Sequence, residues 1–394
     1  MKKILLPSPI GFKAGGINCG VKKSKKDLAL IYSEVSAVCA GMFTTNQIKA
    51  APVRLTKETI ANGQIQAIIA NSGNANCVTG PQGDYDALEM ARAVSQALII
   101  DISKVAVAST GSIGKPLPIK KIVEGVEILG KKISREGFGE AAKAILTTDT
   151  KPKCISKQIL LSGKTVTMTA MAKGAGMIHP NMATMLCFIA TDAKITHPML
   201  KAMLKKSIDN SFNCISVDGC RSTNDTVLIM ANGMADNPII DTQNLHFNMM
   251  QNELNIITKE LASAIVMDGE GATKIIEITV TGAKSDEDAK NTAFSIANYN
   301  LLKCSFFAEV LNIGRIMAAI GACPATIDPE KINIYAGDFL VLNNGQFCPH
   351  IGSEIQQLLK QKKICIKVEL NIGEGNATVW TSDLTPKYVK INMD

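Results

Sequence analysis

The feature that most constrains the fold of this chain is an alternation of short strand-like runs with amphipathic helical segments over its whole length. The strand-like runs are rich in Ile, Val and Thr and are bounded by Gly, Asn or Asp, which is typical of β-strands. They occupy residues 64–71, 104–110, 158–171, 184–191, 225–232, 274–282, 331–337, 364–370, 377–383 and 388–393.

Helical segments fill the intervals between these runs. They cover residues 84–100, 117–147, 197–212, 242–266 and 354–362. In the third of them, apolar residues recur as on one face of an α-helix, at Met199, Leu200, Met203, Leu204, Ile208 and Phe212. Strand-like runs that follow one another directly, mixed with helices, predict a layered α/β (α+β) fold with mainly antiparallel sheets and flanking helices. A doubly wound parallel sheet fits this order less well.

The composition limits the partners of the protein. With 394 residues and 46% hydrophobic content, the chain is long enough for two or three domains, or one large body, and can bury a substantial core. The formal net charge of +7 is small for this length, and only 4% of the residues are aromatic. A basic groove with stacking aromatic side chains is therefore not expected, and neither is nucleic acid as a partner.

Membrane insertion and secretion are not expected either. No window approaches the ~18–20 consecutive apolar residues of a spanning helix. The start, MKKILLPSPIGF, has prolines that interrupt its short apolar run, so a signal peptide is not predicted. These observations predict a cytoplasmic protein with no membrane partner.

The spacing of the cysteines and histidines does not predict a metal centre. The eleven cysteines include no C-x-x-C pair and are expected to be free thiols, without a disulfide framework. The chain has four histidines and no H-E-x-x-H motif, so no metal site is predicted. The glycine-rich segments 110–116 and 268–274 miss the phosphate-binding patterns and are expected to be turns at strand ends.

The most unusual segment is KGAGMIHPNMATML at 173–186, which leads into an apolar strand. It is interpreted either as a loop before a core strand or as a site where the Thr184 hydroxyl acts as a nucleophile. Such a hydroxyl needs a base, and His179 is the only side-chain candidate nearby. The alternative base is an α-amine, created if the chain is cut so that the threonine becomes N-terminal.

A series of further motifs carries a resemblance to a known family. The chain resembles the ornithine acetyltransferase (glutamate N-acetyltransferase) family of arginine biosynthesis, and the match extends over nearly its whole length. The segments that carry it are GFKAGG (11–16), FTTNQIKAAPV (43–53), NSGNAN (71–76), STGSIGKPLPIKKI (109–122), TTDTKPK (147–153), MAKGAGMIHPNMATMLCFIATDA (171–193), STNDT (222–226), DGEGATK (268–274) and DLTPKYVKIN (383–392).

The resemblance implies a precursor that cuts itself between Ala183 and Thr184. The products would be an alpha chain, 1–183, and a beta chain, 184–394, that assemble as an α₂β₂ heterotetramer with the fold of N-terminal-nucleophile aminopeptidases. Thr184 would attack the acetyl group of N2-acetylornithine, and glutamate would accept that group. The α-amine of Thr184 would serve as the base, because its reference pKa near 8 suits proton transfer at neutral pH.

The resemblance also assigns the other site residues. Thr110 and Gly111 would form the oxyanion hole. Lys173 would bind the substrate α-carboxylate, Thr150 would add a hydroxyl contact, and Glu270 and Asn392 would complete the substrate site, with Glu270 at the amino end of ornithine. No cofactor is implied, and whether acetyl-CoA is also an acetyl donor is left open.

Some segments depart from the family pattern, and two other functions stay open. The chain reads Cys220-Arg221 where the family usually has Asp-Thr, FAEVLNIGR at 307–315 where it usually has FGEDPNWGR, and ends two residues after Asn392. One alternative function is an N-terminal-nucleophile aminopeptidase or amidase, in which water replaces glutamate. The other is a non-catalytic relative that binds amino acids.

Overall fold

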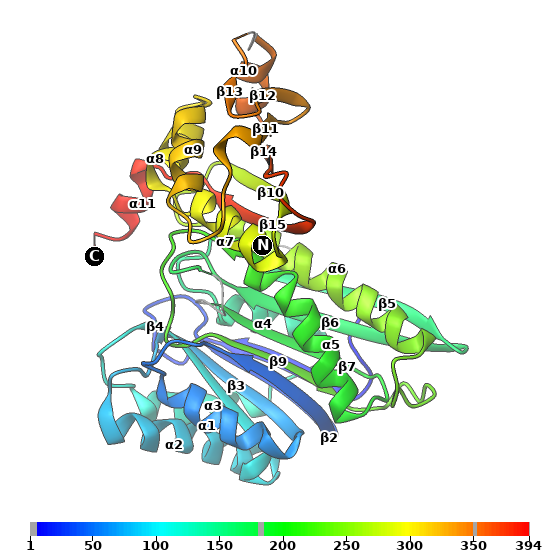
Figure 1. Cartoon of the computed structure of the whole chain (residues 1–394). Helices are drawn as coiled ribbons and strands as arrows, with labels where there is room; N and C mark the ends of the chain where they lie inside the picture. Colours follow the sequence, from blue (N-terminus) through cyan, green and yellow to red (C-terminus); the bar gives the residue numbers. More distant parts are fainter. Residues whose placement is uncertain (1–5, 180–184, 350–352, 394) are drawn as a thin grey trace. The chain divides into compact units, whose positions relative to one another are not determined.

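The computed structural model describes residues 6–179, 185–349 and 353–393. These residues form two compact units (Figure 1). Unit 1 comprises 6–177, 185–213 and 221–265, and unit 2 comprises 178–179, 214–220, 266–349 and 353–393. Each unit has its own sheet and is described by itself.

Unit 1 is built on a sheet whose strands run in the order β4-β3-β2-β9-β7-β6-β5, with β1 pairing β2 beside this path. The strands are β1 (Phe12–Ile17), β2 (Leu28–Phe43), β3 (Gln64–Asn74), β4 (Val105–Ser112), β5 (Lys153–Leu161), β6 (Lys164–Lys173), β7 (Leu186–Thr191) and β9 (Thr226–Ala231). The helices are α1 (Ala51–Thr59), α2 (Gly80–Leu98), α3 (Ile119–Gly130), α4 (Phe138–Ala144), α5 (His197–Asp209) and α6 (Leu245–Met267), the last of which continues into unit 2.

The long strand β2 folds this sheet over on itself. Its first half pairs with β1 and β3, its second half pairs with β9, and its register with β3 shifts between Tyr32 and Ala37. Inward-facing residues from both halves share one hydrophobic core, in which Ile68 of β3 packs with Phe188 of β7. The two halves of the sheet therefore face each other across that core.

Helices cover the outer faces of the folded sheet. Because successive side chains of a strand point to opposite faces, Ile69 of β3 and Val107 of β4 face away from the shared core. They pack instead with Met90 of α2 and Val126 of α3. Helix α5 contacts β2, and Figure 1 shows it alongside β7 and β9. Unit 1 is thus layered as helices, sheet, sheet and helices, with α4 contributing to the core that the two halves of the sheet share.

Unit 2 has a sheet in the order β13-β12-β11-β14-β10-β15-β8. Its strands are β8 (Ile215–Ser216), β10 (Ile275–Ala283), β11 (Asn333–Ala336), β12 (Phe339–Asn343), β13 (Gln346–Phe347), β14 (Lys363–Glu369) and β15 (Gly375–Ser382). Its helices are α7 (Asp286–Ala297), α8 (Asn300–Phe307), α9 (Ile313–Gly321), α10 (Ser353–Leu359) and α11 (Pro386–Ile391). Its core joins Ile278 of β10 and Val379 of β15 with Ile296 of α7 and Ile316 of α9.

The predicted fold class is confirmed. Most strand pairings are antiparallel; the parallel ones are β3–β4, β7–β9, β10–β14 and β15–β8. Residues 233–244 form a loop between β9 and α6. The predicted alpha and beta chains are defined by a cleavage, which the two compact units do not address, so they stay a prediction.

Three predicted elements were wrong in detail. The single strand expected at 158–171 is the hairpin of β5 and β6, because Ser162 and Gly163 adopt φ of 49° and 79° and turn the chain back. The helix expected at 117–147 is interrupted and forms α3 and α4. The strand expected at 388–393 is mostly helix α11, which begins with Pro386 and is capped by Thr385, whose Oγ1 accepts the Lys387 N–H.

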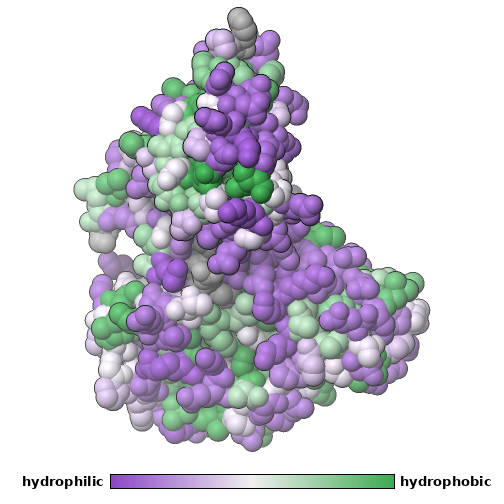
Figure 2. Space-filling model, viewed as in Figure 1, coloured by the Kyte–Doolittle hydropathy of each residue, from purple (hydrophilic) through white to green (hydrophobic). Residues whose placement is uncertain are grey.

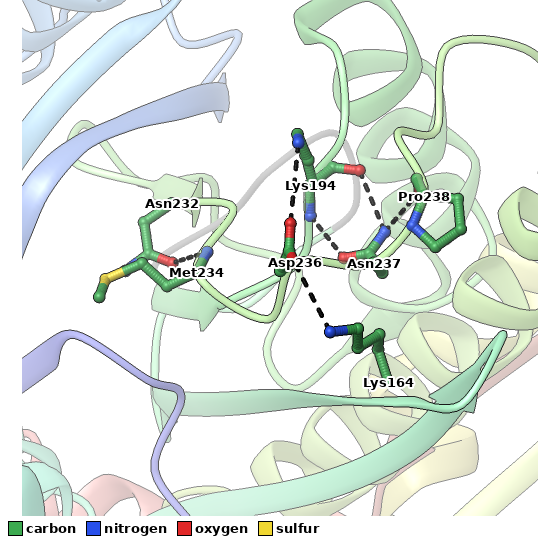
Figure 3. A network of polar contacts seen from close by, with 7 residues as sticks. All are labelled: Lys164, Lys194, Asn232, Met234, Asp236, Asn237 and Pro238. Carbon is green, nitrogen blue, oxygen red and sulfur yellow. Dashed lines mark hydrogen bonds and ion pairs between the residues drawn. The ribbon is translucent and has the colours of Figure 1, made fainter.

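The loop 233–244 is held by a polar network (Figure 3). Asn237 Oδ1 accepts the Lys194 N–H at 2.8 Å, and its Nδ2 donates to the carbonyl groups of Lys194 and Pro238 at 3.3 and 2.7 Å. Asp236 lies 3.5 Å from Lys164 Nζ and 4.0 Å from Lys194 Nζ. Because exposed ion pairs contribute only about 0–1 kcal/mol, the Asn237 hydrogen bonds are expected to hold this loop more firmly than the ion pairs of Asp236 do.

The visible surface is mostly polar. Figure 2 shows a largely hydrophilic face on which the apolar side chains form small, separate patches. Within the described ranges, no helix has both the length and the apolar content needed to cross a bilayer.

Candidate active site

Several strand ends of unit 1 meet at one edge of the folded sheet. Lys173, the last residue of β6, is paired with Leu186, the first residue of β7. Leu186 is paired in turn with Thr226, the first residue of β9, which is paired with Phe43 at the end of β2. The strand register therefore gathers the segments that flank these strands at a single edge.

The fold of β2 brings the end of β4 to the same edge. Lys173 Nζ donates a hydrogen bond to Thr110 Oγ1 at 3.3 Å. Asn224, two residues before β9, donates through Nδ2 to the carbonyl groups of Ala75 and Ser109 at 2.7 and 2.8 Å. These bonds tie together segments that are far apart in the sequence, so the edge is a defined structural site.

The end of β4 carries the predicted oxyanion pair, Thr110 and Gly111. Gly111 has φ of 137°, and an added Cβ would lie 2.3 Å from the carbonyl carbon of Gly73 and 2.4 Å from the nitrogen of Asn74. Only glycine fits this position. Thr110 is buried, whereas Gly111 is exposed. A hydroxyl thus lies beside an exposed glycine, and a hydroxyl together with a neighbouring peptide N–H is a donor set suited to an oxyanion.

The buried lysines at this edge are balanced by Asp149. Its Oδ1 accepts from Lys153 Nζ at 2.8 Å and from the Gly174 N–H at 2.7 Å. Burial opposes ionisation of Asp149, but the positive charges of Lys173 and Lys153 and the hydrogen bonds outweigh it and hold its pKa well below the usual range. Thr150, the predicted hydroxyl contact, follows Asp149 directly and is exposed.

A further lysine, Lys22, lies at the same corner of unit 1. Its Nζ donates to the Leu146 carbonyl at 2.7 Å, and its side chain passes close to Gly73, where an added Cβ would lie 2.9 Å from Lys22 Cγ. Burial lowers the pKa of Lys22 to about 8; the charge of Lys173 acts in the same direction, and Asp27 acts against it. An anionic group entering this corner would meet both lysines.

In unit 2, the predicted substrate residues Glu270 and Asn392 contact each other. Asn392 Nδ2 donates to Glu270 Oε2 at 2.7 Å. The turn that holds Glu270 packs on α11, because Thr385 Oγ1 donates to the Gly271 carbonyl at 2.8 Å. Gly271 has φ of 73°, and an added Cβ would lie 2.6 Å from the nitrogen of Tyr388, so glycine is required there as well.

The remaining predicted residues concern the nucleophile. Ala183 and Thr184 lie outside the described residues, so the cleavage site and the nucleophile stay predictions. His179 belongs to unit 2, where its Nδ1 lies 3.5 Å from Asn298 Nδ2 and its ring centroid lies 6.1 Å from that of Phe294.

The structure thus assembles the predicted residues in two groups. Unit 1 brings Thr110, Gly111 and Lys173 together, and unit 2 brings Glu270 and Asn392 together. Sequence reasoning did not assign roles to Lys22, Asp149, Asn224 or Asp225. The last three lie in the motifs TTDTKPK and STNDT, so the motifs that carried the family resemblance were the signal that could have identified them.

A buried hydroxyl and an exposed glycine lie beside buried lysines at the strand ends of this layered α/β fold. This arrangement suits an enzyme that transfers acyl groups. Such an enzyme stabilises the oxyanion of a tetrahedral intermediate and binds a charged substrate at the same place.

Comparison with known proteins identifies the family. The chain belongs to the ArgJ family, whose model matches residues 13–394. It is 47% identical over 394 residues to the arginine biosynthesis bifunctional protein ArgJ of Caldanaerobacter subterraneus, a match that covers 99% of this chain and 97% of the relative. The protein of the same name from Listeria monocytogenes is 45% identical over 388 residues, covering 98% and 97%.

A solved structure agrees with this assignment. The arginine biosynthesis bifunctional protein ArgJ of Bacillus halodurans superposes with a TM-score of 0.51 at 36% identity, over 52% of this chain and 97% of the solved chain. The family resemblance inferred from the sequence motifs is therefore confirmed, and with it the prediction that the chain is an acyltransferase of arginine biosynthesis.

The charge balance at this edge predicts a pH-dependent stability effect. Asp149→Asn is expected to lower the free energy of unfolding at pH 7 by about 3–5 kcal/mol, because it leaves buried lysines without their carboxylate. The pKa of Asp149 is depressed by folding, so its contribution is complete above the unfolded-state pKa of about 4 and is lost as the pH falls below that value.

Urea unfolding of wild type and variant between pH 7 and pH 3 measures this effect. The difference between them should be constant above about pH 5 and should shrink by roughly 1 kcal/mol per pH unit below about pH 4. Asp84→Asn, at an exposed ion pair with Arg54, is the control and should change little. A difference that does not vary over this pH range would contradict the assignment.

Proposed function

We propose that this chain transfers the acetyl group of N2-acetylornithine to glutamate, after it has cut itself between Ala183 and Thr184. The observation that carries the proposal is the contact of the buried Lys173 ammonium with Thr110 beside Gly111, at the sheet edge where β7 begins. Membership of the ArgJ family supports the same activity, since the relatives are named for arginine biosynthesis.

The proposed reaction has two half-reactions in which bonds and protons balance. In the first, Thr184 Oγ bonds to the acetyl carbon, the amide C–N bond breaks, and the hydroxyl proton passes through the α-amine to the departing amino group of ornithine. In the second, the amino group of glutamate attacks the acetyl ester, the C–O bond breaks, and a proton from the attacking amino group passes through the α-amine to Thr184 Oγ. Splitting the transfer in this way replaces one difficult step by two easier ones.

The residues of unit 1 are assigned by their chemistry. The Thr110 hydroxyl and the Gly111 peptide stabilise the oxyanion in both half-reactions. Because Thr110 Oγ1 accepts from Lys173, its own proton can point toward the substrate. Lys173 binds the substrate α-carboxylate as a compact cation, and Thr150 adds a hydroxyl contact.

The proposal also covers the residues of unit 2, a second activity, the assembly and the location of the protein. Glu270, held by Asn392, is assigned to the amino end of ornithine. The relatives are called bifunctional, which supports a second activity in which acetyl-CoA donates the acetyl group to an amino acid. An α₂β₂ assembly of alpha and beta chains and a cytoplasmic location belong to the same proposal.

The cleavage is tested by the intact mass of the purified protein. Mass spectrometry should find chains corresponding to residues 1–183 and 184–394 in place of one 42.0 kDa chain. Thr184→Ala lacks the attacking hydroxyl and should remain one inactive chain. Thr191→Ala removes another hydroxyl of the same segment, bonded to the Thr167 carbonyl at 2.9 Å, and should still be cut. A wild-type protein that stays intact after prolonged incubation would contradict the proposal.

The transfer is tested by its dependence on glutamate. Ornithine should be released from N2-acetylornithine only when glutamate is present, with N-acetylglutamate formed in equal amount, because the acetyl-enzyme waits for its acceptor. Liquid chromatography of both products measures this. Release of ornithine and acetate without glutamate would instead indicate an amidase, and binding of N2-acetylornithine without either product would indicate a non-catalytic relative.

The oxyanion assignment is tested by Thr110→Val, which removes the hydroxyl and keeps the shape of the side chain. Loss of one such donor should lower kcat by about 10²–10³-fold, because the donor acts mainly on the transition state. Steady-state kinetics on cleaved protein measures kcat and KM separately. Thr56→Val, which removes the hydroxyl bonded to Val107 of the same strand, should leave kcat within about threefold. Equal kcat for Thr110→Val and wild type would refute the assignment.

A further inference from the structure

Lys22 is a partly buried lysine at the candidate site of unit 1, and the proposed reaction gives it no role. Its Nζ donates to the carbonyl group of Leu146 at 2.7 Å. Leu146 lies four residues before Thr150, which is assigned to the substrate. The bond uses one of the three hydrogens of the ammonium group, so the other two can serve a further acceptor.

The stem of Lys22 lies close to the predicted oxyanion hole. An added Cβ on Gly73 would lie 2.9 Å from Lys22 Cγ, so the lysine passes where the chain has no side chain. Gly73 is paired with Gly111 in the parallel ladder of β3 and β4. An added Cβ on Gly111 would in turn lie 2.3 Å from the carbonyl carbon of Gly73. Lys22 and Gly111 thus contact the same short segment of β3.

The carboxylates that act on Lys22 are engaged by other groups. Asp27 Oδ1 accepts the backbone N–H of Cys19, and its Oδ2 accepts the backbone N–H of Lys22, both at 2.7 Å. Asp149 Oδ1 accepts from Lys153 Nζ at 2.8 Å. The Lys22 ammonium is therefore held beside these carboxylates while their oxygens bond elsewhere.

The charges at this corner favour the entry of an anion. Burial lowers the pKa of Lys22 to about 8, and the charge of Lys173 acts in the same direction. Two ammonium groups that act on each other in this way repel. A carboxylate bound by Lys22 would offset this repulsion and replace the water that burial removes.

The acceptor of the proposed reaction carries one more carboxylate than the donor does. N2-acetylornithine has an α-carboxylate and a side-chain ammonium group, whereas glutamate has an α-carboxylate and a side-chain carboxylate. Lys173 is assigned to the α-carboxylate and Glu270 to the ammonium group. Because a carboxylate such as Glu270 repels the side chain of glutamate, that side chain calls for a cation of its own.

We propose that Lys22 binds the side-chain carboxylate of glutamate when glutamate accepts the acetyl group. Lys173 holds the α-carboxylate of the same molecule, so each carboxylate of the acceptor has one ammonium group. The inference rests on the proposed function and deepens it, because it names the residue that selects a dicarboxylic amino acid as acceptor.

Lys22→Met tests this role, because methionine keeps an unbranched stem and lacks the ammonium group. In a ping-pong reaction, kcat/KM for each substrate reports its own half-reaction. We expect kcat/KM for glutamate to fall about 10–100-fold through loss of a charge-assisted hydrogen bond, and kcat/KM for N2-acetylornithine to stay within about threefold. Steady-state kinetics with both substrates varied measures the two constants.

Glutamine as acceptor separates loss of the charge from a general disturbance of the site. It has the shape of glutamate but a neutral side chain, so wild type should prefer glutamate and Lys22→Met should lose most of that preference. Lys121→Met is the matched control, because the exposed Lys121 also donates to a carbonyl of this loop, that of Gly20 at 3.2 Å. It should keep the preference. An equal loss for N2-acetylornithine and glutamate, or an unchanged preference in Lys22→Met, would overturn the inference.

Two further variants cover the case in which Lys22→Met is not cut or does not fold. Lys22→Arg keeps the charge and should keep the preference for glutamate, whereas Lys22→Gln keeps a donor without the charge and should lose it. Equal preferences in these two variants would overturn the inference, as would a wild type that uses both acceptors equally. If wild type transfers no acetyl group to glutamate, the proposed function fails first, and the two failures are thereby distinguished.

Discussion

The site depends on the bend in strand β2, which brings the two halves of the unit 1 sheet together. Asn71, near the end of β3, is paired with Leu28 at the start of β2, whereas β9 begins opposite Phe43 at its end. Along a straight strand those points would lie about 50 Å apart, at ~3.3 Å per residue. Because β2 bends, Thr110 of the β3–β4 half and Lys173 of the other half approach to 3.3 Å. A buried core shared by both halves stabilises the bend.

Charge compensation is the second requirement of this edge. Buried lysines are tolerated in a protein interior only with paired anions or hydrogen bonds, and Asp149 supplies both to Lys153. Burial lowers the pKa of Lys22 to about 8, so Lys22 gives up its proton more easily than an exposed lysine but is still mostly protonated at pH 7. The edge thus carries the positive charge of several lysines, and Asp149 limits the electrostatic cost of holding them together.

Local sequence patterns predicted the layered fold and most of its strands, and physical reasons explain the misses. The run at 158–171 looked continuous because Ser162 and Gly163 are a short turn between Ile-, Val- and Thr-rich halves. The segment 388–393 has strand-like composition, but the Pro386 start and the Thr385 cap favour a helix. The site residues came from motifs. Contacts such as that of Asn224 with Ser109 depend on the bend of β2, which no local pattern encodes.

The position of the proposed cut is compatible with the sheet. The described ladder of β7 begins at Leu186, paired with Lys173 on one side and Thr226 on the other, so a cut before residue 184 removes none of these ladder hydrogen bonds. The sheet order also interleaves the proposed chains, since β9 pairs with β2 and β7 pairs with β6. Each pairing would join a strand of the beta chain to one of the alpha chain. Separation would then require breaking two strand interfaces and a shared core, so the cut chains are expected to stay associated without a covalent link.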